Sequence, residues 1–109
     1  MAVRRGEVWT VAGGAYAGKP RPAIIVQSDR VTGFNSVTVV PCTTDPTDAP
    51  LIRPELQPSA GNGLHADCRV MVDKITTVPR GNFGTRIGMV SAEDMLRIDR
   101  SLLLFLGIG

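Results

Sequence analysis

The sequence predicts a mainly β protein with one C-terminal helix, built as a small, strongly bent antiparallel sheet or barrel. Short runs of β-branched and other apolar residues alternate with turn residues through most of the chain. The apolar residues take up helical spacing only near the C-terminus. The length of 109 residues suits one domain, residues 1–109, with a single modest core.

The first strands have the clearest patterns. Residues 7–11 alternate polar and apolar side chains, as a half-buried strand does. Residues 22–26 are almost wholly apolar, which predicts a central strand covered on both faces. Residues 37–40 are rich in β-branched side chains. Pro41 follows them, and we expect it at a strand end or edge because proline cannot donate to a sheet ladder.

Two further strands are expected before the helix. Residues 51–56 form a weaker strand that is interrupted by Pro54. Residues 68–74 form a fifth strand, which continues toward Val78. Alternate side chains of a strand share one face, so the outer face of this strand should carry Arg69, Met71 and Asp73.

The C-terminal segment has the signature of an amphipathic helix. Ser91 is a good N-cap, and Asp94 three positions later complements the helix dipole. Gly107 is expected to end the helix. The apolar stripe between them should pack against the sheet, and its residues are Met95, Ile98, Leu102 and Leu106, with Leu103 and Phe105 beside them.

Composition argues against a secreted protein and against a membrane protein, and it gives little support for a strongly basic nucleic-acid-binding protein. The net charge is only +2, and the basic excess before residue 91 is only +3, which is weak evidence for a polyanionic partner. No secretory signal is visible, and the longest apolar run, residues 102–106, is too short to span a bilayer. We therefore expect a cytoplasmic protein without a membrane partner.

Neither a metal nor another cofactor is expected. Cys42, Cys68 and His65 are dispersed along the chain, whereas a zinc site needs about four clustered ligands. The two cysteines are expected to be buried or half-buried thiols in a reducing compartment.

Three segments carry polar residues that packing alone does not require. Arg21 stands between two prolines, which hold its guanidinium in a narrow range of directions suited to phosphate binding; the alternative is a solvated arginine at a strand end. Thr43 follows a buried strand and can donate to a phosphate oxygen, or else bond its own backbone. Arg69 and Asp73 form either a surface ion pair or the charged wall of a groove.

The order of short motifs resembles the MazF/PemK/Kid family of toxins over essentially the whole chain. No single motif is specific, but their order and spacing are. The matching segments are Arg5-Gly6-Glu7-Val8-Trp9, residues 18–26 with Arg21-Pro22, Val40-Pro41-Cys42-Thr43-Thr44, Asn62-Gly63-Leu64, residues 71–75, Arg86-Ile87-Gly88 and residues 102–107.

The resemblance implies both a fold and an activity. Such toxins form SH3-like barrels of about five to seven antiparallel strands and homodimerise. They are metal-independent endoribonucleases of type II toxin-antitoxin systems, which cut single-stranded RNA at short sequences, leave 2′,3′-cyclic phosphate and 5′-hydroxyl ends, and inhibit translation and growth. A cognate antitoxin lays a disordered, acidic tail across the RNA groove.

Matched by position, the catalytic residues are Arg21 and Thr43. The residues expected to bind RNA are Lys19, Thr44, Arg69, Asp73 and Arg86. The 2′-hydroxyl of the RNA supplies the nucleophile, so the protein has to align it and stabilise charge on the phosphate. Arginine keeps its proton at physiological pH, so we assign Arg21 to electrostatic stabilisation.

Two departures from the family leave the general base open. Some members carry a glutamate in the loop before the arginine, where residues 13–17 here contain no acid. Kid-like members have an arginine two residues before the strand aspartate, where this chain has Met71; Arg69 is a candidate substitute. His65 is read as a loop residue with at most a contact role.

Two other functions compete with RNA cleavage. A CcdB-like gyrase poison shares the general barrel but needs neither Arg21 nor Thr43. A plain SH3-like binding module would need a groove lined with aromatics, and the chain has few: one Trp, one Tyr and three Phe. Of these, Trp9 is expected in the core, while Phe83 is a candidate for base stacking.

Overall fold

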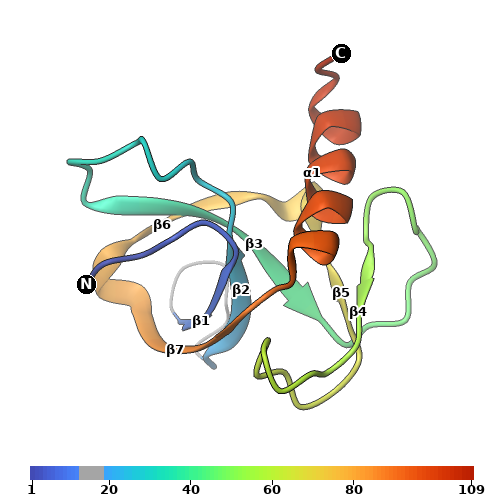
Figure 1. The fold of residues 1–109 in the computed structure, drawn as a ribbon, viewed down its shortest axis with the longest axis horizontal. Helices are drawn as coiled ribbons and strands as arrows, with labels where there is room; N and C mark the ends of the chain where they lie inside the picture. Colours follow the sequence, from blue (N-terminus) through green and yellow to red (C-terminus); the bar gives the residue numbers. More distant parts are fainter. Residues whose placement is uncertain (13–18) are drawn as a thin grey trace.

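A strongly curved antiparallel sheet forms a half-barrel with one helix packed on its side (Figure 1). The computed structural model describes residues 1–12 and 19–109. Its strands are β1 (Glu7–Val11), β2 (Arg21–Ile25), β3 (Ser36–Thr43), β4 (Glu55–Leu56), β5 (Cys68–Val70), β6 (Thr76–Pro79) and β7 (Phe83–Met89), followed by helix α1 (Ala92–Leu106). The predicted fold class is confirmed. Of the seven strands in the described residues, β7 was not predicted from the sequence.

The sheet runs in the order β4-β5-β3-β2-β1-β7, and β6 pairs with the other half of β3. Strand β2 lies between β1 and β3 and is buried on both faces, as its apolar run predicts. Side chains on one face, such as Ile24 and Val40, pack toward the helix residues Ile98 and Leu102. Those on the other face form a second cluster around Trp9, Val11, Ala23, Ile25, Val37, Val39 and Val78.

Pro41 decides where β5 ends. The expectation that Pro41 ends a strand is wrong: it lies inside β3, opposite Ala23. It stands at the point where the outer neighbour of β3 changes from β6 to β5. The Pro41 carbonyl accepts from the Met71 amide at 2.8 Å, but proline has no N–H to return the bond. The Met71 carbonyl accepts instead from the Lys74 amide at 3.0 Å, which starts a 3-10 turn, Val72–Lys74.

The expected strand over residues 68–74 is therefore wrong beyond Val70. Asp73 lies in the 3-10 turn and does not share a strand face with Arg69. The carboxylate of Asp73 instead accepts two bonds of 3.0 Å from Arg53. The sequence from Val72 to Pro79 is a turn followed by a separate strand, β6, which pairs with the first half of β3.

The weak strand predicted over residues 51–56 is also shorter than expected. Only Glu55 and Leu56 pair, with Arg69 and Cys68 of β5. The segment before them is a turn, in which the amides of Ile52 and Arg53 both donate to the Ala49 carbonyl.

A loop after β4 closes the barrel against β7. Asn62 is 2% exposed; its side chain accepts from the amides of Ser59 and Leu64 and donates to the Gln57 carbonyl. The Met89 amide donates to the Gly61 carbonyl at 2.8 Å. Two glycines permit this approach: a Cβ on Gly63 would lie 2.0 Å from the Ile87 carbonyl oxygen, and one on Gly88 would lie 2.4 Å from the backbone of Asn62.

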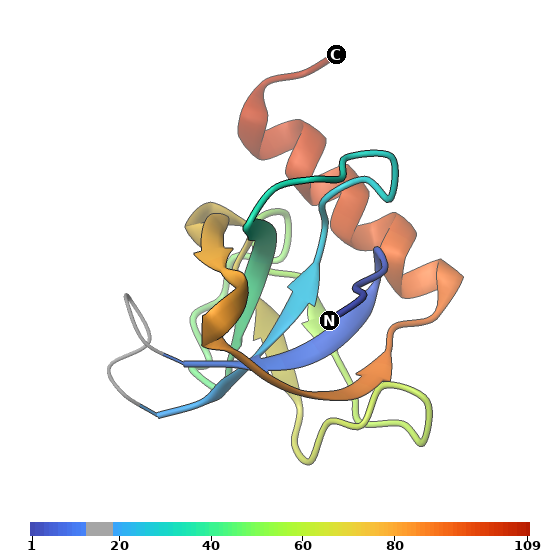
Figure 2. The same ribbon diagram turned by 90° about the vertical axis from the view of Figure 1, so that its left-hand side faces the viewer.

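Helix α1 begins and ends where predicted. The Ser91 hydroxyl accepts from the Asp94 amide, and Gly107 adopts the left-handed conformation, φ +71°. Ile98 and Leu102 are buried, but the expectation that the whole stripe packs on the sheet is wrong. The last turns project beyond the strands (Figures 1 and 2), which leaves exposed Leu103, Leu104, Phe105 and Leu106. No helix in the described part of the chain is long and apolar enough to cross a membrane.

The N-terminal motif fastens β1 to the rest of the fold. Glu7 is 6% exposed, and its carboxylate accepts from the Arg4 amide, Trp9 Nε1 and Arg86 Nε. These donors lower the pKa of Glu7, although burial alone would raise it. Arg5 pairs with Asp99 of the helix. Trp9 packs edge-on against Phe83 in the core, as predicted for this tryptophan.

Candidate functional site

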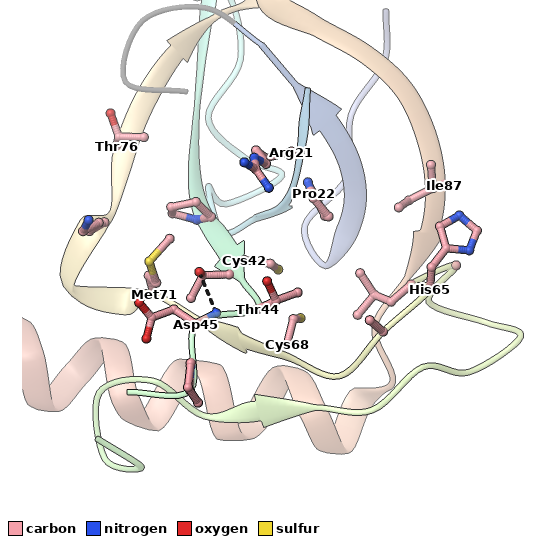
Figure 3. A pocket seen from close by; sticks show the side chains of 17 residues that line it. Arg21, Pro22, Cys42, Thr44, Asp45, His65, Cys68, Met71, Thr76 and Ile87 are labelled. Carbon is pink, nitrogen blue, oxygen red and sulfur yellow. Dashed lines mark hydrogen bonds between the residues drawn. The ribbon is translucent and has the colours of Figure 1, made fainter. Parts of the chain in front are cut away.

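A cavity of about 800 Å3 opens where β2 and β5 begin and β3 ends (Figure 3). Its volume is in the usual range for ligand sites. Arg21 stands above the floor. Met71 and Thr76 lie on one side, and His65 and Ile87 lie on the opposite side. Lys74 and Leu64 also line the cavity. The remaining lining residues come mainly from the end of β3 and the turn after it, including Thr43, Thr44 and Asp45.

The register of β2 and β3 brings Arg21 and Thr43 to the same place. The strands pair antiparallel, with Ala23 opposite Pro41. Continuing that register by two residues sets Arg21 opposite Thr43, and the alternation of side chains sends both to one face of the sheet. Both line the cavity. Two residues that are 22 positions apart in sequence are thus brought together by the strand pairing.

Both side chains have donors available to a ligand. The Thr43 Oγ1 accepts from the Asp45 amide at 3.1 Å, so its own hydroxyl hydrogen is left to donate. Arg21 is exposed and makes no ion pair with any residue the structure describes. A guanidinium and a hydroxyl directed at one cavity suit a phosphate group. Thr44 lies beside them on the cavity wall (Figure 3).

The other predicted RNA-binding residues lie outside the cavity lining. Arg69 contacts Glu55 at 3.6 Å and donates to the Asp45 carbonyl. Arg86 is paired with Glu7 at 2.7 Å. Asp73 is engaged by Arg53 in the 3-10 turn. Lys19 is exposed just before β2. Residues 13–17, which match the glutamate-bearing loop of some family members, lie outside the described residues.

Lys74, a cation on the cavity wall, was not predicted from the sequence as a site residue. In a strand over residues 68–74, Lys74 would face the core with Val70 and Val72. The 3-10 turn instead exposes it on the cavity wall, without an ion pair to any described residue. The signal that could have revealed it was Pro41, whose missing donor ends the ladder. His65 also lines the cavity and is exposed (Figure 3), consistent with the contact role considered for it.

Two free thiols, Cys42 and Cys68, form part of the cavity floor. Both are buried, as the sequence predicts. A hydrogen bond to Cys68, together with burial, raises the pKa of the Cys42 thiol well above its ordinary value. The neighbouring thiol lowers the pKa of Cys68, so the two thiols lie close enough to influence each other. Among the described residues there is no cluster of three or more His, Cys, Asp or Glu that could hold a metal ion.

Comparisons with known proteins agree with this fold. The family model described as "PemK-like, MazF-like toxin of type II toxin-antitoxin system" matches residues 4–106. A "Probable endoribonuclease MazF" of Mycolicibacterium smegmatis is 51% identical over 108 residues, covering 98% of this chain and 99% of the relative. "Endoribonuclease MazF9" of Mycobacterium tuberculosis is 31% identical, covering 97% of this chain and 98% of the relative.

Solved structures give the same result. A mycobacterial endoribonuclease in complex with its cognate antitoxin superposes with a TM-score of 0.82 at 27% identity, covering 99% of this chain and 98% of that one. The half-barrel, its cavity and the matched family define the class of protein: a toxin of a type II toxin-antitoxin system. The chain belongs to the PemK-like, MazF-like family of these toxins. The alternative of a CcdB-like gyrase poison is not favoured.

Proposed function

We propose that this toxin, an endoribonuclease, cuts single-stranded RNA through attack by the substrate's own 2′-hydroxyl and thereby inhibits translation and growth. The observation that carries the proposal is the convergence of Arg21 and Thr43 on one cavity, each with a donor to offer. We infer a single-stranded substrate, because proteins that read RNA sequence mostly recognise unpaired bases.

The reaction exchanges one phosphorus–oxygen bond for another. The 2′-oxygen attacks phosphorus as its proton leaves, and the bond to the 5′-oxygen breaks as that oxygen gains a proton. The products are a 2′,3′-cyclic phosphate and a 5′-hydroxyl. Negative charge grows on the phosphate oxygens in the transition state, where Arg21 and the Thr43 hydroxyl stabilise it. The RNA supplies the nucleophile, so the mechanism needs no metal-bound water.

Lys74 and Thr44 extend the same site. Lys74 lies on the cavity wall with its ammonium free of ion pairs to described residues, which suits the phosphate of a neighbouring nucleotide. Thr44 offers a hydroxyl beside Thr43. Lys19 and Arg86 remain candidates for binding RNA outside the cavity. Arg69 and Asp73 contribute indirectly, because their contacts with Glu55, Asp45 and Arg53 hold the loops beside the cavity in place.

The toxin acts in the cytoplasm as a homodimer and is inhibited by a cognate antitoxin. The similar mycobacterial endoribonuclease was solved with its cognate antitoxin, which supports a partner of that kind here. An acidic, disordered antitoxin segment would compete with RNA for the positive side chains of the cavity. The exposed apolar end of α1 supports a dimer contact.

The test is incubation of a long single-stranded RNA with the toxin in EDTA, followed by chemical mapping of the cut ends. We expect cleavage to persist and to leave cyclic phosphate and 5′-hydroxyl ends. Arg21→Ala and Thr43→Val should each lower the rate on the order of a hundredfold, since each removes one donor to the transition state.

The matched control is Arg30→Ala, which removes an exposed arginine that does not line the cavity. It should cut at the wild-type rate. A requirement for magnesium, or a folded Arg21→Ala protein with wild-type activity, would refute the mechanism.

A further inference from the structure

Asp45 is an acidic residue in a cavity that otherwise suits a polyanion. It follows Thr43 and Thr44 directly and lines the cavity with them. In Figure 3 its carboxylate lies on the side of Met71, away from His65 and Ile87. A carboxylate repels phosphate, and Asp45 lines the same cavity as Arg21 and Thr43. Its natural partner in a bound RNA is therefore a hydrogen-bond donor on a base.

The direction of this carboxylate is fixed before any ligand arrives. Oδ1 accepts from the Thr47 amide at 2.9 Å and from the Thr47 hydroxyl at 2.6 Å. The Asp45 amide donates to Thr43 Oγ1, and its carbonyl accepts from Arg69. Four hydrogen bonds with three residues therefore hold Asp45 in place, next to the proposed catalytic threonine and to β5, which reduces the entropy lost when a ligand binds.

The second oxygen, Oδ2, accepts no hydrogen bond from any residue that the structure describes. The two bonds from Thr47 lower the pKa of Asp45, so the group is ionised at neutral pH and acts only as an acceptor. The cavity therefore presents one oriented acceptor next to the phosphate site.

We propose that Asp45 selects the base beside the scissile phosphate by accepting a hydrogen bond from an exocyclic amino group. Cytosine, adenine and guanine carry such a group, and uracil does not. The single N–H on the pairing edge of uracil is flanked by two carbonyl oxygens, which a carboxylate repels. The inference rests on the proposed RNA cleavage and adds a discrimination against uracil at one position.

Asp45→Asn tests this with little change of shape. An asparagine keeps Oδ1 as the acceptor for Thr47 and replaces Oδ2 with an NH2 donor. The variant should therefore lose the preference for an amino group and accept the carbonyl of uracil. We would sequence the cut ends from a pool of random single-stranded RNA, and then time the cleavage of two oligonucleotides that differ only by cytosine or uracil at the selected position.

The wild type should favour the amino-bearing base by about tenfold, and Asp45→Asn should abolish or invert that ratio. Asp48→Asn is the matched control, because it makes the same change of charge in the same loop at an exposed residue outside the cavity. It should leave the ratio unchanged.

The outcomes separate this inference from the proposed function. If the wild type cuts no RNA, the proposed function is wrong. If the wild type cuts and Asp45→Asn keeps the same base preference, Asp45 does not read the base. If Asp45→Asn cuts too slowly for its products to be sequenced, its base preference can be measured as binding instead. The two oligonucleotides then carry a 2′-deoxy nucleotide at the cut site, which prevents cleavage, and compete for the variant. An unchanged preference there also overturns the inference.

Discussion

Single residues in this toxin divide into those that hold the half-barrel and those that are free to meet a ligand. Arg69, Arg86, Arg21 and Lys74 all carry a positive charge. However, Arg69 is paired with Glu55, and Arg86 is paired with Glu7. Arg21 and Lys74 line the cavity without an ion pair to any described residue. Charge type alone therefore does not identify a binding residue, because the neighbouring carboxylates decide which cations are available.

Glu7 gives a prediction about pH. Its pKa in the folded protein is lowered, so its contribution to stability is present above the pKa of an unfolded glutamate and is lost as the pH falls through the folded value. Glu7→Gln should lower the free energy of unfolding near neutral pH by about 2 kcal/mol. Urea titrations at pH 7 and in steps down to pH 3 would measure the difference from wild type, which should shrink in acid.

Glu93→Gln is the control for this titration, because Glu93 is exposed on the helix surface. It should change stability by no more than about 0.5 kcal/mol. A difference between wild type and Glu7→Gln that stays constant from pH 7 to pH 3 would mean that the Glu7 network is not the source of the effect.

At the scale of elements, the sequence predicted what local patterns determine. The strands at residues 7–11, 22–26 and 37–40 and the helix from Ser91 to Gly107 match the structure, because their periods and caps are local. The strand predicted over residues 68–74 does not match, because the point at which β5 ends depends on Pro41, a residue on another strand. Arg21 and Thr43 were singled out from their places at strand ends and given catalytic roles by the family resemblance, whereas the wrongly predicted strand hid Lys74.

Helix α1 gives the second prediction. Its last turns expose a run of large apolar side chains, including Leu104 at 54% and Phe105 at 43% exposed. If this end forms the dimer contact, Leu104→Glu with Phe105→Glu should convert the toxin to a monomer, since the contact would have to bury two charges. Sedimentation velocity measures the change. The unfolding temperature of the monomer itself should not fall, because neither side chain is in the core.

Phe34→Glu is the matched control for the helix, because Phe34 is equally apolar, 64% exposed and located in the loop before β3. It should sediment as the wild type does. A monomeric wild type, or a dimeric double variant, would exclude the helix end as the contact.

The whole molecule combines one positive cavity with a small overall charge. The net charge is +2, so long-range attraction for a polyanion is weak and binding has to be local to the cavity. This bears on inhibition, because an acidic antitoxin segment and an RNA strand would then depend on the same few cations.

Antitoxin binding gives the third prediction, which belongs to the scale of the whole molecule. Arg21→Glu with Lys74→Glu should weaken binding of the cognate antitoxin on the order of tenfold, and raising the salt from 0.1 to 0.5 M should weaken wild-type binding in the same direction. Calorimetric titration measures both. Arg30→Glu, outside the cavity, controls for net charge. Binding that ignored both the substitutions and the salt would place the antitoxin elsewhere.

The seam between Gly63 and Gly88 has a consequence for how such toxins diversify. Each glycine is there because the backbone of the opposite segment fills the space a side chain would take. A side chain acquired at either position would therefore push the loop after β4 away from β7 and move His65 with it. A substitution at either glycine therefore requires a compensating change in the opposite segment, and such a paired change would reshape one wall of the cavity while Arg21 and Thr43 stay where β2 and β3 hold them.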